Sequence, residues 1–156
     1  MITLRLPGQR PRELRSLVLD FNGTLALDGV LLAGVRSRIG AVIKLLDVHV
    51  VTGDTFGTVR SALRSLDLHV EVLPPLRQGA AKERYVAALG PGSVCAIGNG
   101  NNDAAMLKRA ALAIAVLGRE GCAGATVRAA DIVVRDIIDG LELLTNPKRL
   151  VASLRT

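Results

Sequence analysis

The stretch that decides the fold is Leu17-Val18-Leu19-Asp20-Phe21-Asn22-Gly23-Thr24. It begins with a short apolar run, which predicts a buried strand over residues 17–20. The Asn-Gly pair that follows is a turn signal, so the chain is expected to leave the sheet just beyond the carboxylate. In open α/β sheets, ligands bind outside the carboxyl ends of the strands. Asp20 is therefore the first candidate for a functional residue.

Short apolar runs alternate with longer amphipathic stretches along the rest of the chain. This alternation predicts a parallel sheet with right-handed crossovers, and hence a three-layer, Rossmann-like α/β fold with helices on both faces. The other strands are expected at residues 48–52, 68–73, 94–97, 112–116 and 132–134. Helices are expected at about 34–46, 56–66, 78–89, 102–110, 120–130 and 136–145, with a short one after Pro147.

One segment interrupts the alternation directly after the first strand. Asp28-Gly29 stands between two apolar triplets, and a tight hairpin turn favours such a pair because it requires positive φ angles. We therefore expect a small β-hairpin flap beside the end of that strand. The rest of residues 23–52 has room for one helix, and residues 54–82 have room for one helix and one strand. Neither segment has room for a further domain.

The chain has 156 residues, of which 49% are hydrophobic, and this suits a single domain over residues 1–156. Residues 1–15 are rich in Arg and Pro, and we expect them to form a loosely tied arm or an edge strand. No signal peptide is expected, and no apolar run approaches the roughly 20 residues of a membrane span. A cytoplasmic location without a membrane partner is the resulting expectation.

The net charge is +6. A basic balance suits an anionic partner, such as nucleic acid or a phosphorylated substrate, or it serves solubility alone. Aromatic residues make up 2% of the chain, so it lacks the stacking platforms on which many single-strand binders depend. Nucleic acid is therefore the less favoured partner.

Polar residues follow three of the expected strands: Asp20 ends the first, Thr52-Gly53-Asp54 the second, and residues 98–103 the fourth. Lys82 lies in the helix before that fourth strand. A carboxylate at a strand tip can attack phosphorus and form an aspartyl-phosphate, while a Thr hydroxyl, backbone N–H groups and a Lys bind the phosphoryl oxygens. Mg²⁺ requires oxygen ligands, and Asp20 and Asp103 offer them. The set predicts phosphoryl transfer.

These motifs, in this order, resemble those of the haloacid-dehalogenase-like (HAD) superfamily. Within it, the chain is similar to the phosphorylation domain of P-type cation ATPases and to its soluble stand-alone relatives. The resemblance covers about residues 16–145 and rests on Asp20-Phe21-Asn22-Gly23-Thr24, Val51-Thr52-Gly53-Asp54, Ala81-Lys82-Glu83, residues 98–103 with Met106, and Ala130-Asp131-Ile132-Val133-Val134. It implies a capless HAD-like hydrolase, a phosphatase in particular.

The resemblance also implies a role for each matching residue at the reacting group. Asp20 would be the nucleophile, with Asn22 at the position of the acid–base residue. Thr52 and Gly53 would bind the phosphoryl oxygens, and Lys82 would neutralise both the nucleophile and the phosphate. Asn102 would orient the loop or bind the phosphate.

The cofactor that the resemblance implies is Mg²⁺. Asp20 would bind the ion through its carboxylate, and Asn22 through its backbone carbonyl. Asn99 and Asp103 would hold it directly or through water.

Two positions depart from the family pattern. Family phosphatases usually have an Asp in place of Asn22, which protonates the leaving group and then activates water. Loss of a general acid–base typically costs about 10²–10⁴ in rate, so slow turnover or a persistent aspartyl-phosphate is expected. Asn99 stands where the family has a metal-binding Asp. An amide oxygen still coordinates a cation, so we expect Mg²⁺ binding that is weakened but not abolished.

The leading hypothesis is a slow, Mg²⁺-dependent phosphomonoesterase that acts through an aspartyl-phosphate on Asp20. The second hypothesis is a catalytically impaired HAD-like protein with a regulatory role, which binds phosphate or a partner. The third is a nucleic-acid-associated protein that uses its Arg-rich surface. Without a cap the site is expected to be open, which suits a phosphorylated macromolecule, or a small phosphorylated molecule if a homo-oligomer closes the pocket.

Overall fold

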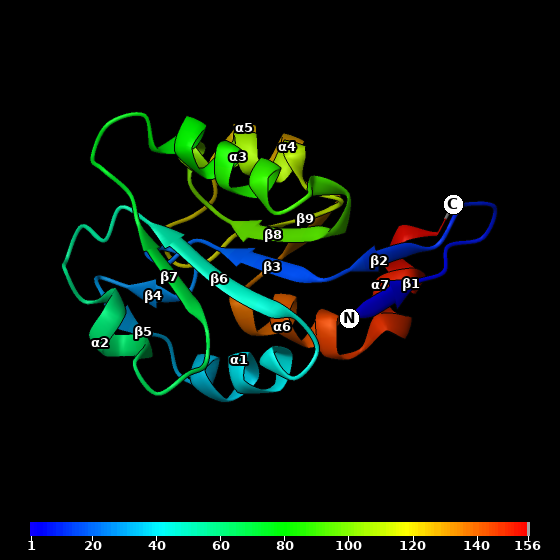
Figure 1. Ribbon diagram of the computed structural model, residues 1–156, viewed down its shortest axis with the longest axis horizontal. Coiled ribbons are helices and arrows are strands. Elements are labelled where there is room, and N and C mark those ends of the chain that lie inside the picture. The colour runs from blue at the N-terminus through cyan, green and yellow to red at the C-terminus, as the bar shows by residue number, and fades with distance from the viewer. Residues whose placement is uncertain (156) are drawn as a thin grey trace.

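The computed structural model describes residues 1–155, and its centre is a sheet of six parallel strands (Figure 1). The strands are β3 (Ser16–Leu19), β6 (Asp47–Thr52), β7 (His69–Val72), β8 (Val94–Gly98), β9 (Leu112–Val116) and β10 (Ile132–Val134). Their spatial order is β10-β9-β8-β3-β6-β7. The six expected strands are therefore confirmed.

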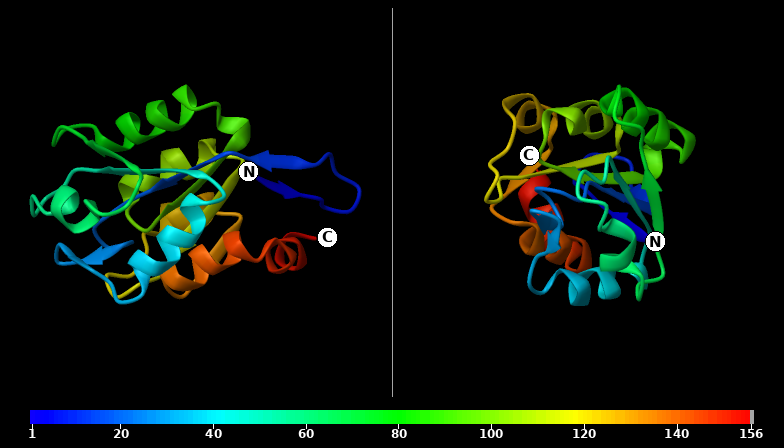
Figure 2. Two further views of the ribbon diagram at one scale, coloured as in Figure 1. Left: turned by 60° about the horizontal axis from the view of Figure 1, so that its bottom comes forward. Right: turned by 90° about the vertical axis from the view of Figure 1, so that its left-hand side faces the viewer.

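Helices cover both faces of the sheet (Figures 1 and 2). One face carries α3 (Gln78–Ala88), α4 (Ala104–Arg109) and α5 (Gly124–Ala129), and the other carries α1 (Val35–Ile43) and α6 (Ile137–Thr145), which α7 (Pro147–Leu154) follows. The described residues include no cap domain, so the capless three-layer α/β fold is confirmed. Within residues 1–155, no helix is long and apolar enough to cross a membrane.

β3 forms the middle of the core because its side chains are buried on both faces of the sheet. Leu17 and Leu19 join the apolar cluster that contains Ile39 of α1 and Leu141 of α6. Val18, between them, joins a second cluster on the α3 and α4 side. Successive side chains of a strand point to opposite faces, so a central strand that is covered on both faces needs consecutive apolar residues, as at positions 17–19.

The order of the strands reverses at β3. From β3 the chain moves outward through β6 to β7, and it then returns to the other side of β3 to form β8, β9 and β10. The strand ends at Leu19, so Asp20, which was expected within it, lies just beyond; its N–H still donates to the Ile97 carbonyl at 3.1 Å. Asp20 thus occupies the switch point, where α/β sheets bind ligands.

The expected flap is present as the hairpin of β4 (Ala26–Leu27) and β5 (Val30–Leu31). Its turn residues Asp28 and Gly29 have φ angles of 51° and 78°, as a tight hairpin turn requires. The Thr58 hydroxyl donates to the Gly29 carbonyl at 2.8 Å, next to the short helix α2 (Val59–Leu63). The flap is therefore tied to the segment that follows β6.

Three helices are shorter than expected because loops take over their first turns. The helix predicted at 56–66 is α2, which begins only after Gly57 with its φ of 65°. The helix predicted at 102–110 is α4 preceded by a 3₁₀ turn, Asn101–Asp103. The one predicted at 120–130 is α5, because the chain makes a turn at residues 118–121 first.

Residues 1–15 form neither a loose arm nor an edge strand of the central sheet. They form a separate antiparallel hairpin of β1 (Ile2–Leu4) and β2 (Arg12–Leu14). Only Arg15 separates β2 from β3, so the hairpin continues the central strand at its amino end (Figure 1). Leu4 and Leu14 are fully buried in the main core, which holds the hairpin in place.

Candidate active site

A polar pocket of about 220 Å³ opens at the carboxyl ends of β3, β6 and β8. The predicted site residues that line it are Asp20, Asn22, Thr52, Gly53, Asn99 and Asn102, and the other lining residues are Thr55, Gln78, Gly100 and Glu120. Lys82 and Asp103, which were also predicted, lie behind this pocket and contact it through Asp20 and the 98–103 loop. The fold therefore brings the residues of all four predicted motifs together.

The centre of the site is a buried ammonium between two carboxylates. Lys82 Nζ lies 2.6 Å from Asp20 Oδ1 and 2.6 Å from Asp103 Oδ1, and its side chain is fully buried. Lys82 is held there by α3, which also buries Val86, one helical turn further on the same face. A buried charge is tolerated only when it is paired, and each of these groups provides a partner for the next.

Asp103 organises the loop that follows β8. Its second oxygen, Oδ2, accepts the N–H groups of Asn99 at 3.0 Å and Gly100 at 2.9 Å. A side chain on Gly98 would lie only 2.5 Å from the Asp103 carboxyl carbon, so glycine is required for this close approach. Because both oxygens of Asp103 are engaged inside the protein, the water-mediated form of its predicted metal contact fits this geometry better than the direct one.

The buried charges shift one another's protonation. Burial and, to a smaller extent, the neighbouring Asp103 carboxylate raise the pKa of Asp20 to about 7 against the attraction of Lys82. Burial also disfavours the ammonium of Lys82, but the two carboxylates outweigh that effect and raise the pKa of Lys82. A cation in the pocket would favour the ionised form of Asp20, which is the form that attacks phosphorus.

Thr24 connects Asp20 to the loop after β8, a role that the sequence analysis did not assign. Its hydroxyl oxygen, which is fully buried, lies 3.4 Å from Asp20 Oδ2 and 3.2 Å from Asn99 Oδ1. Both oxygens therefore face the same small volume. The sequence did contain an indication of this role, because Thr24 is the last residue of the first motif.

Thr52-Gly53-Asp54 divides its work between the pocket and the next helix. Thr52 and Gly53 line the pocket, and Thr52 Oγ1 accepts the Asp54 N–H at 3.1 Å, which leaves the hydroxyl proton available to a ligand. Asp54 Oδ1 accepts the N–H groups of Thr58 at 2.9 Å and Val59 at 3.1 Å. Asp54 therefore caps the start of α2, while its two predecessors face the site.

Gln78 also lines the polar pocket. It is the first residue of α3, and its side-chain oxygen accepts from Asn102 Nδ2 at 3.2 Å. A side chain on Gly53 would lie 2.3 Å from Gln78 Nε2, so Gln78 packs against the Thr52-Gly53 backbone. The sequence contains no motif that relates residue 78 to residue 102, because their contact arises only when α3 packs beside the loop after β8.

The donor set of the pocket fits a hard divalent cation. Asn22 Oδ1 is buried and, within residues 1–155, is the one such side-chain atom without a hydrogen-bond partner. Carboxylate oxygen is available at Asp20, amide oxygen at Asn99 and Asn22, and no sulfur or imidazole lines the pocket. In the described part of the chain, no three His, Cys, Asp or Glu side chains gather into a metal site, so a cation here must use amide and carbonyl oxygens as well.

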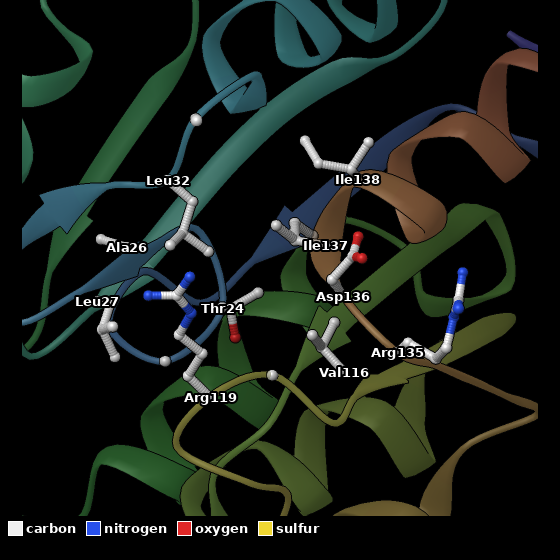
Figure 3. A pocket seen from close by; sticks show the side chains of 13 residues that line it. Thr24, Ala26, Leu27, Leu32, Val116, Arg119, Arg135, Asp136, Ile137 and Ile138 are labelled. Carbon is white, nitrogen blue, oxygen red and sulfur yellow. The ribbon is translucent and has the colours of Figure 1, made fainter.

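A second, larger pocket of about 450 Å³ adjoins the first at the 22–24 segment, where Gly23 and Thr24 line it (Figure 3). Most of its walls are apolar, with Leu27 from the flap, Leu32 just after it, and Ile137 and Ile138 from the start of α6. Two arginines, Arg119 and Arg135, also line it, and the guanidinium of Arg119 extends toward Leu27 and Thr24 (Figure 3). These walls suit a ligand with an apolar body and an anionic group.

Solved structures share this architecture over most of the chain. The fold matches 3-deoxy-D-manno-octulosonate 8-phosphate phosphatase of Moraxella catarrhalis, in complex with magnesium, phosphate and its sugar, with a TM-score of 0.71 at 15% identity over 91% of each chain. The phosphatase of the same name from Yersinia pestis gives a TM-score of 0.69 at 20% identity, over 90% of this chain and 85% of that one. The fold is HAD-like.

The cobalt-bound form of the corresponding Haemophilus influenzae phosphatase shares the HAD-like fold too, with a TM-score of 0.68 at 14% identity over 90% of this chain and 92% of the other. No family model matches the sequence. An uncharacterized protein of Methanocaldococcus jannaschii is 53% identical over 62 residues, which are 40% of this chain and 67% of that protein. The chain belongs to the same family as this archaeal protein, and the HAD-like resemblance of its motifs is confirmed at the level of the fold.

Proposed function

We propose that the protein is a Mg²⁺-dependent phosphohydrolase in which Asp20 is the nucleophile. One observation carries the proposal: Asp20, held by the buried Lys82, opens into a polar pocket at the switch point of a HAD-like sheet. Its like-fold structures include phosphatases, one of them with magnesium and phosphate bound.

The two oxygens of Asp20 have different surroundings. Oδ1 is bound to Lys82 at 2.6 Å, whereas Oδ2 has only the 3.4 Å contact with Thr24. Oδ2 is therefore the freer oxygen, and we assign to it the attack on phosphorus. The new Oδ2–P bond forms as the bond from phosphorus to the leaving oxygen breaks, and the leaving group departs with the electron pair.

The phosphoryl oxygens require donors at the pocket wall. The Thr52 hydroxyl and the backbone around Gly53 supply them, and Asn102 lines the same pocket beside Gln78. Lys82 holds Asp20 in place and compensates the charge that accumulates around it.

Bound Mg²⁺ would neutralise charge on the phosphoryl group. Its ligands in this chain would be the Asp20 carboxylate, the Asn22 backbone carbonyl and Asn99 Oδ1, with Asp103 acting through water. Asn99 Oδ1 is turned toward Asp20, since the amide nitrogen on its other side donates to the Gly121 carbonyl at 3.3 Å.

Asn22 affects the rates of the two chemical steps, phosphorylation of Asp20 and hydrolysis of the aspartyl-phosphate, to different degrees. An amide neither protonates a leaving group nor takes a proton from water. Attack by Asp20 on a substrate with a good leaving group needs no acid, whereas hydrolysis of the aspartyl-phosphate needs a base to activate water. The second step is therefore the slow one, and the phosphorylated form of Asp20 accumulates.

The substrate is a phosphorylated small molecule or macromolecule. The absence of a cap from the described residues leaves the pocket open, which suits a large substrate or closure by a second copy of the chain. A monomer that turns over small substrates rapidly would contradict both forms of this proposal.

The test is release of phosphate from para-nitrophenyl phosphate with and without Mg²⁺. We expect slow, Mg²⁺-dependent activity that Asp20→Asn abolishes and Asn22→Asp increases by about 10² or more, as restoring a general acid–base does. If the natural protein shows no more activity than the Asp20→Asn control at high Mg²⁺, the proposal that it is an enzyme is contradicted. The result would favour the alternative, a HAD-like protein that binds phosphate or a partner. The two amides at positions 22 and 99 are the observation that supports this alternative.

A further inference from the structure

Glu120 is the one carboxylate of the polar pocket that the expected chemistry does not use. It stands beyond the carboxyl end of β9, in a turn closed by a hydrogen bond from the Gly121 N–H to the Gly118 carbonyl at 3.4 Å. The turn is fixed from outside as well, since the Gly118 N–H donates to the Arg135 carbonyl at 3.0 Å. Although its side chain is exposed, Glu120 lines the same pocket as Asp20 and Asn22.

The carboxylate of Glu120 lies next to the side chain of Asn99. A Cβ atom on Gly23 would meet Glu120 Oε2 at 2.5 Å, Asn99 Nδ2 at 2.5 Å and Asn99 Oδ1 at 2.8 Å. All three atoms thus surround one point above the Gly23 backbone. Because Asn99 Oδ1 shares the Thr24 hydroxyl with Asp20 Oδ2, the Asn99 amide lies near both carboxylates.

Asn99 itself holds the turn that carries Glu120. Its Nδ2 donates to the Gly121 carbonyl at 3.3 Å, and its backbone carbonyl accepts the Ala123 N–H at 2.8 Å. An aspartate at position 99 has no N–H to offer Gly121. Asn99 is neutral where the family pattern has a negatively charged Asp. The same side chain anchors the turn that places the negative charge of Glu120 in the pocket.

We infer that Glu120 supplies the second carboxylate for the divalent cation, in place of the one that is missing at position 99. This inference rests on the proposed function, because it concerns the same cation. It also balances the site: Asp20, Asp103 and Glu120 carry three negative charges, which Lys82 and one Mg²⁺ neutralise.

The experiment is a calorimetric titration of the full chain with MgCl₂ in the absence of any phosphate compound. Glu120→Gln is expected to raise the Mg²⁺ Kd at least about tenfold, the size of effect typical for residues that support a metal site. Glu83→Gln is the matched control, since Glu83 is an exposed glutamate on α3 outside the pocket, and its Kd is expected to equal that of the natural protein. Asn99→Asp combined with Glu120→Gln is expected to restore binding, because the carboxylate then returns to position 99.

The outcomes separate the two claims. If the natural protein binds Mg²⁺, Asp20→Asn weakens that binding and Glu120→Gln does not, the inference about Glu120 is wrong and the proposed function stands. If the natural protein shows no Mg²⁺ binding at millimolar concentrations, both fail. Thermal melting of each variant by circular dichroism verifies that it is folded before titration.

Discussion

The two ends of the central sheet carry small hairpins with opposite surroundings. At the amino end, the β1–β2 hairpin packs Leu4 and Leu14 into the aliphatic core. At the carboxyl end, the β4–β5 flap stands beside a pocket of carboxylates and amides, with the charges of Asp20, Lys82 and Asp103 buried behind it. One end stabilises the fold by removing apolar surface from water, whereas the other assembles polar groups whose burial is costly without partners.

This difference teaches that stability and function are separated along the strands. Side chains at the apolar end stabilise the fold in proportion to the apolar surface that they bury. Truncation of one of them therefore lowers the free energy of unfolding without disturbing the charged groups at the other end. The charges in the polar end depend on one another, and removal of one leaves the others unpaired. The following predictions test that separation, in order of decreasing effect.

The largest effect is expected at the buried ammonium. Lys82→Met leaves two buried carboxylates without a counter-charge and should lower the free energy of unfolding by about 4 kcal/mol at neutral pH, with complete loss of Mg²⁺-dependent activity. Urea denaturation measures the change. Lys108→Met, on an exposed lysine of α4, is the control and should be nearly neutral. Equal effects of the two substitutions would show that the buried network has no special role.

Truncation in the apolar end should come next. Leu4→Ala is expected to lower the free energy of unfolding by about 3 kcal/mol through lost burial and a cavity, and to leave the Mg²⁺ dependence of activity unchanged at a temperature where the variant is folded. Leu76→Ala, at a leucine that is 79% exposed, provides the comparison and should change little. A shift in Mg²⁺ dependence with Leu4→Ala would argue against the separation of the two ends.

At Asp20, a substitution is expected to raise the free energy of unfolding, whereas the two preceding ones lower it. The folded-state pKa of Asp20 is raised to about 7, so between its unfolded value of 3.8 and pH 7 the folded protein retains a proton that the unfolded chain releases. Stability contributed by this group is therefore present at low pH and lost as the pH rises through 7. Asp20→Asn removes the penalty and should stabilise the metal-free protein by about 2 kcal/mol at pH 8, with the gap closing toward pH 4.

Parallel melts of Asp20→Asn and the natural protein at pH 4, 6 and 8 in the presence of a chelator measure this gap. Addition of Mg²⁺ should narrow it at pH 8, because a cation stabilises the ionised Asp20 of the natural protein. A gap that is constant across pH would contradict the assignment to Asp20.

The smallest effect is expected at the cap of α2. Asp54→Ala removes the acceptor of two backbone N–H groups and should cost about 1 kcal/mol. Asp54→Asn retains an acceptor oxygen and tolerates the positive φ of 45°, so it should cost about half as much. If the helix cap is the whole role of Asp54, phosphatase activity falls by the same small factor in both variants.

The parts of this molecule that were predictable from sequence are those that follow from strand ends. Asp20 and Thr52 were placed because parallel strands bring their carboxyl ends to one edge, and Lys82 through the family motif. The N-terminal hairpin was not predicted: Ile2, Leu4 and Leu6 alternate with Thr3 and Arg5, but this period-two pattern is short and ends at Pro7-Gly8.

Other site residues were harder to predict, for reasons of geometry. Gln78 begins α3 at the residue where a helix was expected to begin, but no local pattern indicates that its side chain lines the pocket and contacts Asn102. Glu120 was hidden inside a stretch expected to be helical, whereas the structure has a turn there. The available signal is its place beyond the carboxyl end of β9, at the same edge of the sheet as Asp20 and Thr52.

The central claim is that Asp20 accepts a phosphoryl group and, with Asn22 in place of an acid–base, releases it slowly. The direct measurement is mass spectrometry of the acid-quenched protein after incubation with acetyl phosphate and Mg²⁺. The account predicts one added phosphoryl group on the peptide that contains Asp20, its absence in Asp20→Asn and without Mg²⁺, and its faster disappearance in Asn22→Asp. A natural protein that shows neither this adduct nor phosphate release above the Asp20→Asn control would contradict the account.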